Sequence, residues 1–480
     1  MPYTVIDNFN LGIDRKRPIY AAAQGSVWDA VNCHISRGGD IEKRKAFVKV
    51  FQLPVTCFGL CTGVSTIYTF GSAPAPSLPS WMTYKQCQHP TDVAIAMTAV
   101  LSSVLFDAKP YCIARFADGN VYHFYDGVLN ADMRNAGGVN MPPKVGTVAY
   151  TFRSKIFTLA DSLLEFSGIN VPLGWESTVD TGAGYINMGN QFSGSANLTG
   201  IDVFQGNLAL FAERAVQIWY IREDEAQNYQ LQTLRNTGTV APRSVLAYGD
   251  IDVFYLDYTG IRSLRARVPS NAAFINDIGT SIDTYVREWR DTIASSVIQN
   301  SMALIEPIDA RFWMVMGSKA FVLSYFPAAQ ISAWTVYELT ADGVPFEAKD
   351  AISYYDRVYI LATDGSLYVY GGDSGQEYDS SEVTVQLPFI YGGKPDTNKM
   401  VTGMDIASTG TWSIDVLVDP SHLERVVTIG ELSSVTTNQL NNAGLASTTH
   451  FAPRLTNNSD GYASLSQVMV AYSGATDATT

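Results

Sequence analysis

ARFADGNVYHFYDG (residues 114–127) and VYILATDGSLYVYGG (residues 358–372) are the two stretches of sequence that decide the fold. Each joins an apolar segment to an alternating one through a tight turn, Asp118–Gly119 in the first and Asp364–Gly365 in the second. Glycine supplies the positive φ that such a β-turn requires. Residues 121–125 then alternate between two faces, as the period of two of a strand demands. Each stretch therefore predicts a β-hairpin.

The same pattern recurs along the chain. Four more copies are IFTLADSLLEFSG (156–168), LALFAERAVQIWY (208–220), VFYLDYTGIRSL (253–264) and RFWMVMGSKAFVLSY (311–325), and a weaker seventh is TCFGLCTGVSTIYTFG (56–71). The turns recur every ~45–60 residues, the spacing of propeller blades. A seven-stranded sandwich needs only ~100 residues, so a single sandwich is too small to hold this many hairpins. We predict an all-β chain with a β-propeller of six or seven blades over residues 51–372, in which Asp118–Gly119 and Asp364–Gly365 occupy equivalent turns.

Two insertions interrupt the predicted blades. Residues 172–200 are rich in Gly, Ser and Asn and predict a long surface loop. The second insertion, near 269–300, contains a predicted helix at 280–299 with Thr280 or Ser281 as its N-cap. Apolar residues recur there at helical spacing: Ile282, Val286, Trp289, Ile293 and Val297.

The two ends of the chain lack the blade pattern. Strands divided by Gly, Pro and Asn turns predict a separate C-terminal β-sandwich, a platform domain, over residues 373–480. The predicted strands are EVTVQLPFIYGG (382–393), KMVTGMDIAS (399–408), TWSIDVLVD (411–419), RVVTIGEL (425–432) and SLSQVMVAYSG (464–474). Residues 1–50 hold no self-contained set of strands. We therefore expect them to form an N-terminal arm that packs on the platform or on a neighbouring subunit.

Composition narrows the classes of function. Hydrophobic residues make up 46% of the chain and charged residues 16%, which excludes global disorder. The net charge is −14, with +3 in residues 1–50 and −8 in residues 371–480. No basic stripe of the kind that grips DNA is present in the sequence. An acidic surface that faces DNA is therefore expected to repel it.

The cysteines and the apolar segments indicate where in the cell the protein is made and whether it enters a membrane. The five cysteines are odd in number and predict no disulfide framework: Cys33, Cys57, Cys61, Cys87 and Cys112. The start, MPYTVIDNFN, lacks an apolar secretory segment, so we expect synthesis in the cytoplasm. The longest apolar run, Val93–Phe106, is too short to span a bilayer, so we expect no membrane insertion.

No motif for catalysis, a cofactor or a metal stands out. Cys57, Cys61, Cys87 and His89 come nearest to a zinc set, but buried free cysteines are the preferred interpretation. Asp118, Asp257 and Asp364 are interpreted as turn formers. EKRKAF (42–47) and IREDEAQ (221–227) are interpreted as solvated loops. We therefore predict no catalytic, cofactor-binding or metal-binding residue and no enzyme activity.

Several segments resemble one family, in the order in which that family carries them. Asn32 through Gly39, with Ile41, Lys43, Arg44, Ala46 and Phe47, resemble an N-terminal motif of the tail nozzle proteins of short-tailed bacteriophages, also called tail tubular protein B. RNTGTVAPRSVLAYGDIDVFYLDYTGIRSL (235–264), FINDIGTSIDTYV (274–286) and ARFWMVMGSKAFVLSYFPAAQISAWTVYEL (310–339) are similar to later segments of that family.

The resemblance implies a structural role in the virion. It implies a homohexameric ring that extends the tail tube, docks beneath a tail adaptor protein and guides genomic DNA out during ejection. Tail fibre or tailspike proteins would be further partners. It implies no cofactor and no catalytic residue. An acidic channel wall suits this role, because it lets phosphates pass without holding them.

Two other functions remain open. A propeller enzyme that degrades host polysaccharide would use a pair of carboxylates, and the sequence does not single out a pair. A monomeric propeller that binds a peptide or a receptor as an adaptor would need no chemistry at all. Release of reducing ends from host glycans distinguishes the first alternative, and the number of copies in solution distinguishes the second.

Overall fold

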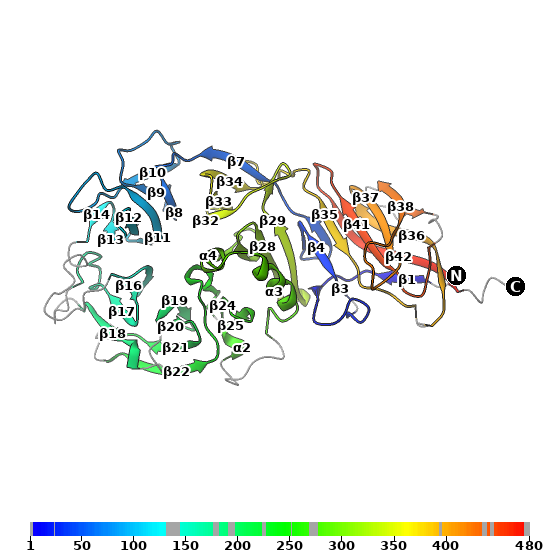
Figure 1. The fold of residues 1–480 in the computed structure, drawn as a ribbon, viewed down its shortest axis with the longest axis horizontal. Coiled ribbons are helices and arrows are strands. Elements are labelled where there is room, and N and C mark those ends of the chain that lie inside the picture. Colours follow the sequence, from blue (N-terminus) through cyan, green and yellow to red (C-terminus); the bar gives the residue numbers. More distant parts are fainter. Residues whose placement is uncertain are drawn as a thin grey trace.

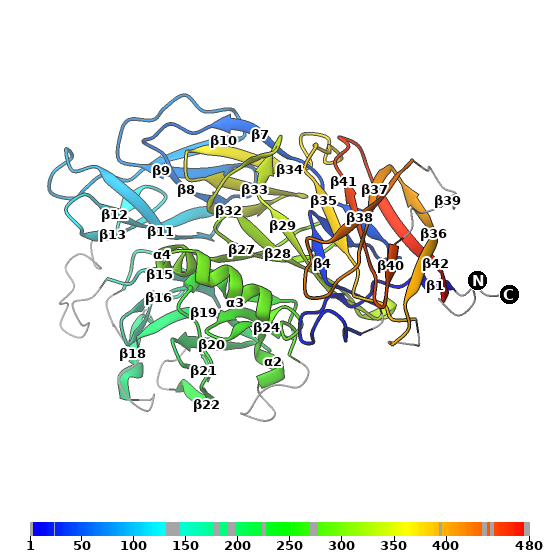
Figure 2. The ribbon, with the colours of Figure 1, turned by 45° about the vertical axis from the view of Figure 1, so that its right-hand side comes forward.

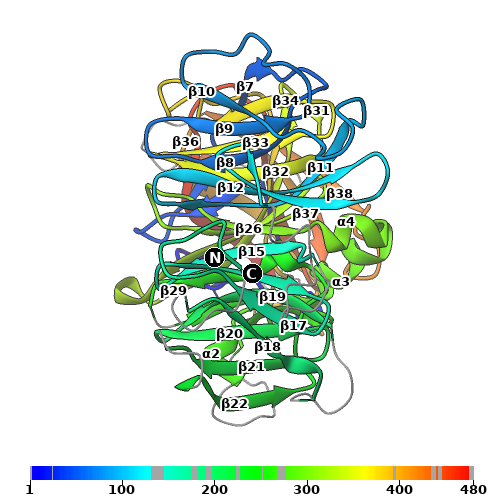
Figure 3. The ribbon, with the colours of Figure 1, turned by 90° about the vertical axis from the view of Figure 1, so that its left-hand side faces the viewer.

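The computed structural model describes residues 3–23, 25–130, 145–175, 182–190, 197–222, 227–250, 252–267, 277–392, 396–433, 439–441 and 446–474. Within them, seven blades of three or four strands follow one another around an axis (Figure 1), and Figure 3 shows them from the side. The innermost strands of successive blades contact one another, and the last of them contacts the first. Between blades 5 and 6 the contact runs through the short helix η3 (Pro242–Ser244). The predicted β-propeller is confirmed, and the described part has seven blades.

The strands are given blade by blade, from the axis outward. Blade 1 holds β8 (Phe58–Thr62), β9 (Ile67–Gly71) and β10 (Met82–Gln86); blade 2 holds β11 (Met97–Phe106), β12 (Lys109–Phe116), β13 (Val121–Tyr125) and β14 (Val128–Leu129); blade 3 holds β15 (Val148–Phe152), β16 (Lys155–Ala160), β17 (Leu163–Phe166) and β18 (Gly184–Asn187). Blade 4 holds β19 (Leu198–Phe204), β20 (Asn207–Ala212), β21 (Ala215–Tyr220) and β22 (Tyr229–Arg235); blade 5 holds β23 (Leu246–Tyr248), β24 (Asp252–Asp257) and β25 (Gly260–Ser263). Blade 6 holds β26 (Met302–Ile305), β27 (Phe312–Met316), β28 (Lys319–Phe326) and β29 (Ile331–Glu338); blade 7 holds β32 (Ala348–Tyr354), β33 (Arg357–Ala362), β34 (Ser366–Tyr370) and β7 (Phe47–Gln52).

The six strong sequence repeats occupy one structural position. Each joins the second strand of a blade to the third. Gly119 and Gly365 adopt φ of 86° and 84° at two of these turns, so their predicted equivalence is confirmed. The weaker repeat at 56–71 is different, because it joins β8 to β9, the first and second strands.

The ring is closed by a strand from the N-terminal end. β7 pairs antiparallel with β34, with Phe47 opposite Tyr370 and Gln52 opposite Ser366. β7 is thus the outermost strand of blade 7, although it precedes every other blade strand in the sequence. A division of the chain at residue 50 passes through the middle of this strand.

The two predicted insertions differ in detail from the structure. Residues 184–187 form β18, so residues 172–200 are not loop throughout, and the fourth strand of blade 3 was missed. The helix predicted at 280–299 is two helices, α3 (Asp283–Thr292) and α4 (Ser295–Gln299). Ile293, the C-cap of the first helix, is extended at ψ 155° and ends it, and Ala294 is the N-cap of the second. The N-cap is Ile282 rather than Thr280 or Ser281. A shorter helix, α2 (Leu264–Arg267), follows blade 5.

The platform consists of two sheets that face each other at the right of Figure 1 and turn toward the viewer in Figure 2. One sheet holds β39 (Gln439–Asn441), β36 (Lys399–Thr409), β42 (Ser464–Gly474), β6 (Ile41–Lys43) and β5 (Cys33–Ile35), with β1 (Tyr3–Ile6) on β42 and β40 (Ala446–Thr448) on β36. The other holds β4 (Asp29–Val31), β35 (Val383–Gln386), β41 (Ala452–Asn457), β37 (Thr411–Leu417) and β38 (Val426–Ser433). Each platform sheet therefore combines strands from both ends of the chain.

Propeller and platform share a sheet and a core. β29 of blade 6 pairs with β4 and with β2 (Gly12–Ile13), itself paired with β3 (Ser26–Val27), so blade 6 continues into the platform. One apolar cluster includes Met314 of blade 6, Val286 of α3 and Val468 of the platform. Gly12 shows how close the contact is, since a Cβ there would lie 2.6 Å from the backbone N of Trp334. The two parts are therefore packed as one body. The small hairpin of β30 (Thr340–Ala341) and β31 (Val344–Pro345) follows blade 6.

Candidate functional site

Asn32 and Arg44 form the buried seam between blade 6 and the platform. Asn32 adopts φ of 55° and its backbone N–H donates to Val336 O at 2.7 Å. Its side-chain amide donates to Glu382 O, and its Oδ1 accepts the N–H of Glu338. Asn32 therefore ties β29 to the platform through both backbone and side chain.

The guanidinium of Arg44 completes this seam. Its Nε donates to Asn32 Oδ1 at 3.0 Å, and its Nη2 donates to Ser381 Oγ at 2.6 Å and to Thr340. Its Nη1 forms an ion pair with Asp379 Oδ2 at 3.3 Å, and both side chains are buried. A buried charge is tolerated only where it is paired and hydrogen-bonded, and Arg44 meets both conditions.

The prediction that EKRKAF is a solvated loop is therefore wrong. Lys43 and Arg44 are fully buried, and Lys43 ends the strand β6. The Lys43 ammonium donates to Asn457 Oδ1 and Ser459 O of the platform. Burial lowers the pKa of Lys43 to about 8, only partly offset by Asp379. The high density of charged residues in this segment predicted that they are exposed. Instead, Lys43 and Arg44 each have a buried partner from a distant segment. Most of IREDEAQ lies outside the described residues.

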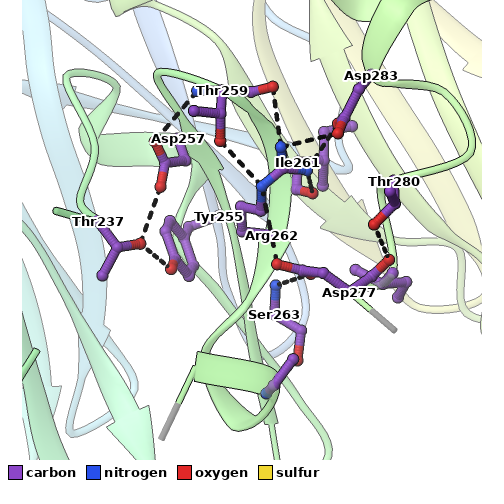
Figure 4. Close-up of polar contacts among 12 residues, drawn as sticks. Thr237, Tyr255, Asp257, Thr259, Ile261, Arg262, Ser263, Asp277, Thr280 and Asp283 are labelled. Atoms are coloured by element: carbon purple, nitrogen blue, oxygen red, sulfur yellow. Dashed lines mark hydrogen bonds and ion pairs between the residues drawn. The ribbon is translucent and has the colours of Figure 1, made fainter. Parts of the chain in front are cut away.

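A second buried arginine anchors α3 to blade 5 (Figure 4). Arg262 on β25 donates to both carboxylate oxygens of Asp283, at 2.6 and 2.9 Å, in the first turn of α3. It also lies 3.7 Å from Asp277 and bonds Thr259. Burial acts to lower the pKa of Arg262, but the hydrogen bond and charge of Asp283 prevail and raise it. The helix that covers the propeller face is therefore fixed by charge as well as by packing.

The centre of the propeller contains a small cavity of about 210 Å³. Innermost strands line it, including Ser102 and Ser103 of β11 and Ala303 of β26. An ion pair between Arg243 of η3 and Asp350 of β32 lies at its edge. Polar side chains also join neighbouring blades here: Asp350 accepts the Leu60 N–H, Ser102 accepts the Ala149 N–H, and Asp202 accepts the Ala247 N–H. Hydrogen bonds of this kind thus join innermost strands of neighbouring blades around the axis.

Two further cavities lie outside this centre. One of about 310 Å³ opens beside α4 and shares Leu101, Ser102 and Arg243 with the central cavity; we call it the mouth cavity. The other, of about 570 Å³, lies in the platform beside β1. It is lined by Thr4–Ile6, residues 20–23 and 388–392, and Tyr472 among others.

The three predicted turn aspartates take up that role. Asp118 Oδ1 accepts the N–H of Asn120, and Asp364 Oδ1 accepts the N–H of Ser366. Asp257 Oδ1 accepts the N–H of Thr259. Each bond spans two residues, the Asx-turn pattern that favours Asp in turns. The turn interpretation is confirmed, and the three carboxylates belong to three different blades.

The residues closest to a metal set are divided between two apolar clusters, with Cys57 in one and Cys61 and Cys87 in the other. Cys57, Cys61 and Cys87 are free and buried. Among the residues that the structure describes, no three His, Cys, Asp or Glu side chains form a group able to hold a metal ion. His89 instead accepts the N–H of Asp92 at Nδ1, and its Nε2 lies 3.0 Å from Asp118 Oδ2. It serves the turn structure of blade 2.

Glu165 is a buried carboxyl that the sequence did not single out. It lies on β17 opposite Thr158 of β16, inside blade 3. In the described part of the chain, neither carboxyl oxygen nor Thr158 Oγ1 has a hydrogen-bond partner. Burial raises the pKa of Glu165 to about 8, so the group is largely protonated at neutral pH. Its placement between apolar strands could not be read from LLEF alone.

His123 and His34 are buried in the neutral form. His123 Nδ1 lies 2.8 Å from Tyr111 Oη, and its Nε2 lies 2.9 Å from Gly146 O. Burial lowers the pKa of His123 to about 4. Burial and the nearby Arg311 lower the pKa of His34 to about 4 as well, although Glu42 acts in the opposite direction. Both rings therefore act as hydrogen-bonding parts of the structure at neutral pH.

These features define a seven-bladed β-propeller joined rigidly to a β-sandwich. No family model matches the chain, and no curated protein matches it. No helix in the described ranges is long and apolar enough to cross a membrane.

Solved structures with distant likeness exist. The chain is similar to the computationally designed Ika8 protein, at 9% identity and a TM-score of 0.37, over 68% of this chain and 99% of Ika8. It is similar to BamB from Moraxella catarrhalis, at 9% identity and a TM-score of 0.38, over 78% of this chain and 97% of BamB. It is also similar to an exo-beta-1,3-galactanase from Phanerochaete chrysosporium, at 12% identity and a TM-score of 0.27, over 84% of this chain and 99% of the galactanase. At these TM-scores, the propeller assignment rests on the strand order of this chain itself.

Proposed function

We propose that this protein is a structural component of a short phage tail. It forms a homohexameric nozzle that extends the tail tube, docks beneath the adaptor protein and guides DNA out during ejection. Its place is in the virion tail, with tail fibre or tailspike proteins as further partners. We propose no enzymatic step and no cofactor for it.

One observation carries this proposal. The nozzle-like motif runs from Asn32 to Phe47, and its Asn32 and Arg44 build the seam between blade 6 and the platform. Phe47, at the end of the motif, begins the strand that closes the propeller. The residues that resemble the family are thus those on which the coupling of propeller to platform depends. A conduit under load needs such coupling, because a loose joint between the two parts would let the wall yield.

The charge of the chain supports passage of DNA rather than binding. The 32 basic residues are outnumbered by 46 acidic ones. Arg44 and Lys43, in the most basic segment, are buried and bound to other residues of the chain, so they are not accessible to DNA. Phosphate contacts that are made must be broken again before DNA can move on, so a wall with few free cations suits a channel.

The decisive experiment is the number of copies in solution. Mass photometry at micromolar concentration should give a species of six chains, and negative-stain images should show six-fold rings. A monomer throughout the concentration range would contradict the nozzle and favour a monomeric adaptor.

A gel shift with duplex DNA at ~150 mM salt tests the channel wall. We expect no shift at sub-micromolar protein, because non-specific binders reach only Kd values of about 10⁻⁴–10⁻⁶ M in that salt. Incubation with host glycans tests the enzyme alternative. Release of reducing ends by the purified protein would overturn the structural assignment.

A further inference from the structure

The mouth cavity brings together side chains from five separate segments. Arg115 comes from β12, Thr147 from the approach to β15, Arg243 from η3, and Gln299 with Asn300 from the end of α4. Leu101, Val148 and Pro242 add apolar walls. The end of α4 thus meets the inner part of the propeller at this point (Figure 1).

The charge at this cavity is opposite to that of the chain. Two guanidinium groups line it, of which that of Arg243 is paired with Asp350 of the central cavity, and none of the described lining residues is Asp or Glu. The chain as a whole carries −14. Among the described residues, no ion pair includes Arg115, whose side chain is exposed. A positive cavity on an acidic protein attracts an anion that most of the surface repels.

The Arg243 side chain is fixed in an orientation in which it lines the cavity. Its Nη2 is paired with Asp350, and its Nη1 donates to Lys349 O at 3.3 Å. Asp350 is itself fixed, because it accepts the N–H groups of Leu60 and Ala351. A side chain that is already oriented loses little entropy when a ligand binds. Arg115, which comes from another blade and is exposed, can move to contact a ligand in the same cavity.

The residue types match one ligand chemistry. Guanidinium groups bind carboxylate and phosphate oxygens through pairs of N–H donors. The carboxamides of Gln299 and Asn300 can bond neutral hydroxyls beside such an anion. A volume of about 310 Å³ suits a molecule about the size of one hexose, at the small end of ligand sites.

We propose that the mouth cavity binds the oxyanion of a small hydroxylated molecule, a carboxylate or a phosphate, between Arg115 and Arg243. This site is separate from the seam, because none of its lining residues belongs to it. It adds recognition of a small acidic solute, such as an acidic sugar unit, to a protein whose other features are structural.

Isothermal titration of the full chain at constant ionic strength tests this site with defined probes. Glucuronate and inorganic phosphate separate the two sources of the anion, and glucose is the neutral match. We expect saturable binding of glucuronate or phosphate, or both, with one site per chain and weaker binding of glucose. Equal binding of glucose and glucuronate, or no binding of either anion, overturns the proposal.

Two variants locate the site, and a third is the control. R115Q should weaken anion binding at least about tenfold through loss of a charged donor. N300D should weaken it further by placing a carboxylate beside the ligand. R214Q, in the exposed turn after β20, should leave binding unchanged. All three positions are exposed, so the fold is expected to persist, and melting curves check it. Anion binding that survives both R115Q and N300D would place the ligand elsewhere and end the proposal.

Discussion

The propeller and the platform are built from the chain in opposite ways. Each propeller blade except the last takes its strands from one continuous segment, so its hairpins are local. The platform pairs strands from the first 43 positions with strands from position 383 onward, as in the pairing of β1 with β42 and of β4 with β35. Local hairpins leave a readable pattern, whereas pairing between distant segments leaves none. The difference also predicts where the chain is most sensitive to change.

The largest effect is expected from truncation at the N-terminal end. Deletion of residues 1–46 removes β1, β4, β5 and β6 together with Asn32 and Arg44. We expect the variant to be insoluble, or to lose cooperative unfolding, because both platform sheets lose strands. Deletion of residues 1–8 is the matched control, since it removes only β1. A soluble protein with the wild-type melting temperature after the longer deletion would show that the platform does not depend on this segment.

Replacement of Arg44 tests the seam at one residue. R44A leaves Asp379 buried without its partner and should lower the free energy of unfolding by about 3–5 kcal/mol. R37A is the control, because Arg37 is exposed and its pair with Asp309 at 3.7 Å should contribute less than about 1 kcal/mol. Urea unfolding of both variants gives the comparison. Equal losses would mean that the buried network contributes no more than a surface ion pair.

Glu165 tests the propeller by pH. Its folded pKa of about 8 exceeds the ordinary 4.5, so the folded state holds a proton that the unfolded state releases. The contribution of Glu165 to the free energy of unfolding should therefore be fully present below pH 4.5 and be lost as pH rises to 8. His123 and His34 act oppositely, but only between pH 4 and 6.5. E165Q should flatten the fall between pH 6.5 and 8 and be more stable than wild type at pH 8 by about 2–4 kcal/mol.

Urea midpoints across that pH interval measure this effect. E213Q, in the exposed turn after β20, is the matched control and should keep the wild-type slope. A wild-type protein whose stability does not change between pH 6.5 and 8 would mean that Glu165 is ionised at little cost inside blade 3.

The smallest effect is expected at a propeller turn. Gly119 adopts φ of 86°, and a Cβ there would meet no atom within 4 Å. G119A should therefore cost about 1 kcal/mol, from backbone strain alone. Gly12 has φ of 58°, but its Cβ would strike the backbone of Trp334. G12A should lower the melting temperature clearly more than G119A. The reverse order would show that the blade turn, and not the contact with β29, is the constrained point.

The sequence revealed what local chemistry specifies. The six hairpins, the turn aspartates and the strands at 383–386 and 411–417 follow from alternation and turn residues. It missed β41 (Ala452–Asn457), because Pro453 and Arg454 break an apolar pattern, although β41 lies between β35 and β37. It also missed the role of Arg44, whose partner Asp379 lies more than 300 positions away. Burial of that charge depends on a contact that no window of sequence contains. The mouth cavity was missed for the same reason.

The closing strand β7 has a consequence for synthesis. It precedes every other blade strand, while its partner β34 is the last, about 310 residues later. At roughly 5–20 residues per second, translation takes about 15–60 s to cover that interval. During this time the ring cannot close, and a strand of sequence FVKVFQ has no partner. Lys49 in its middle is exposed in the finished protein, and lysine on an edge strand discourages pairing with other chains. One charged residue thus protects the nascent chain while its ring is still open.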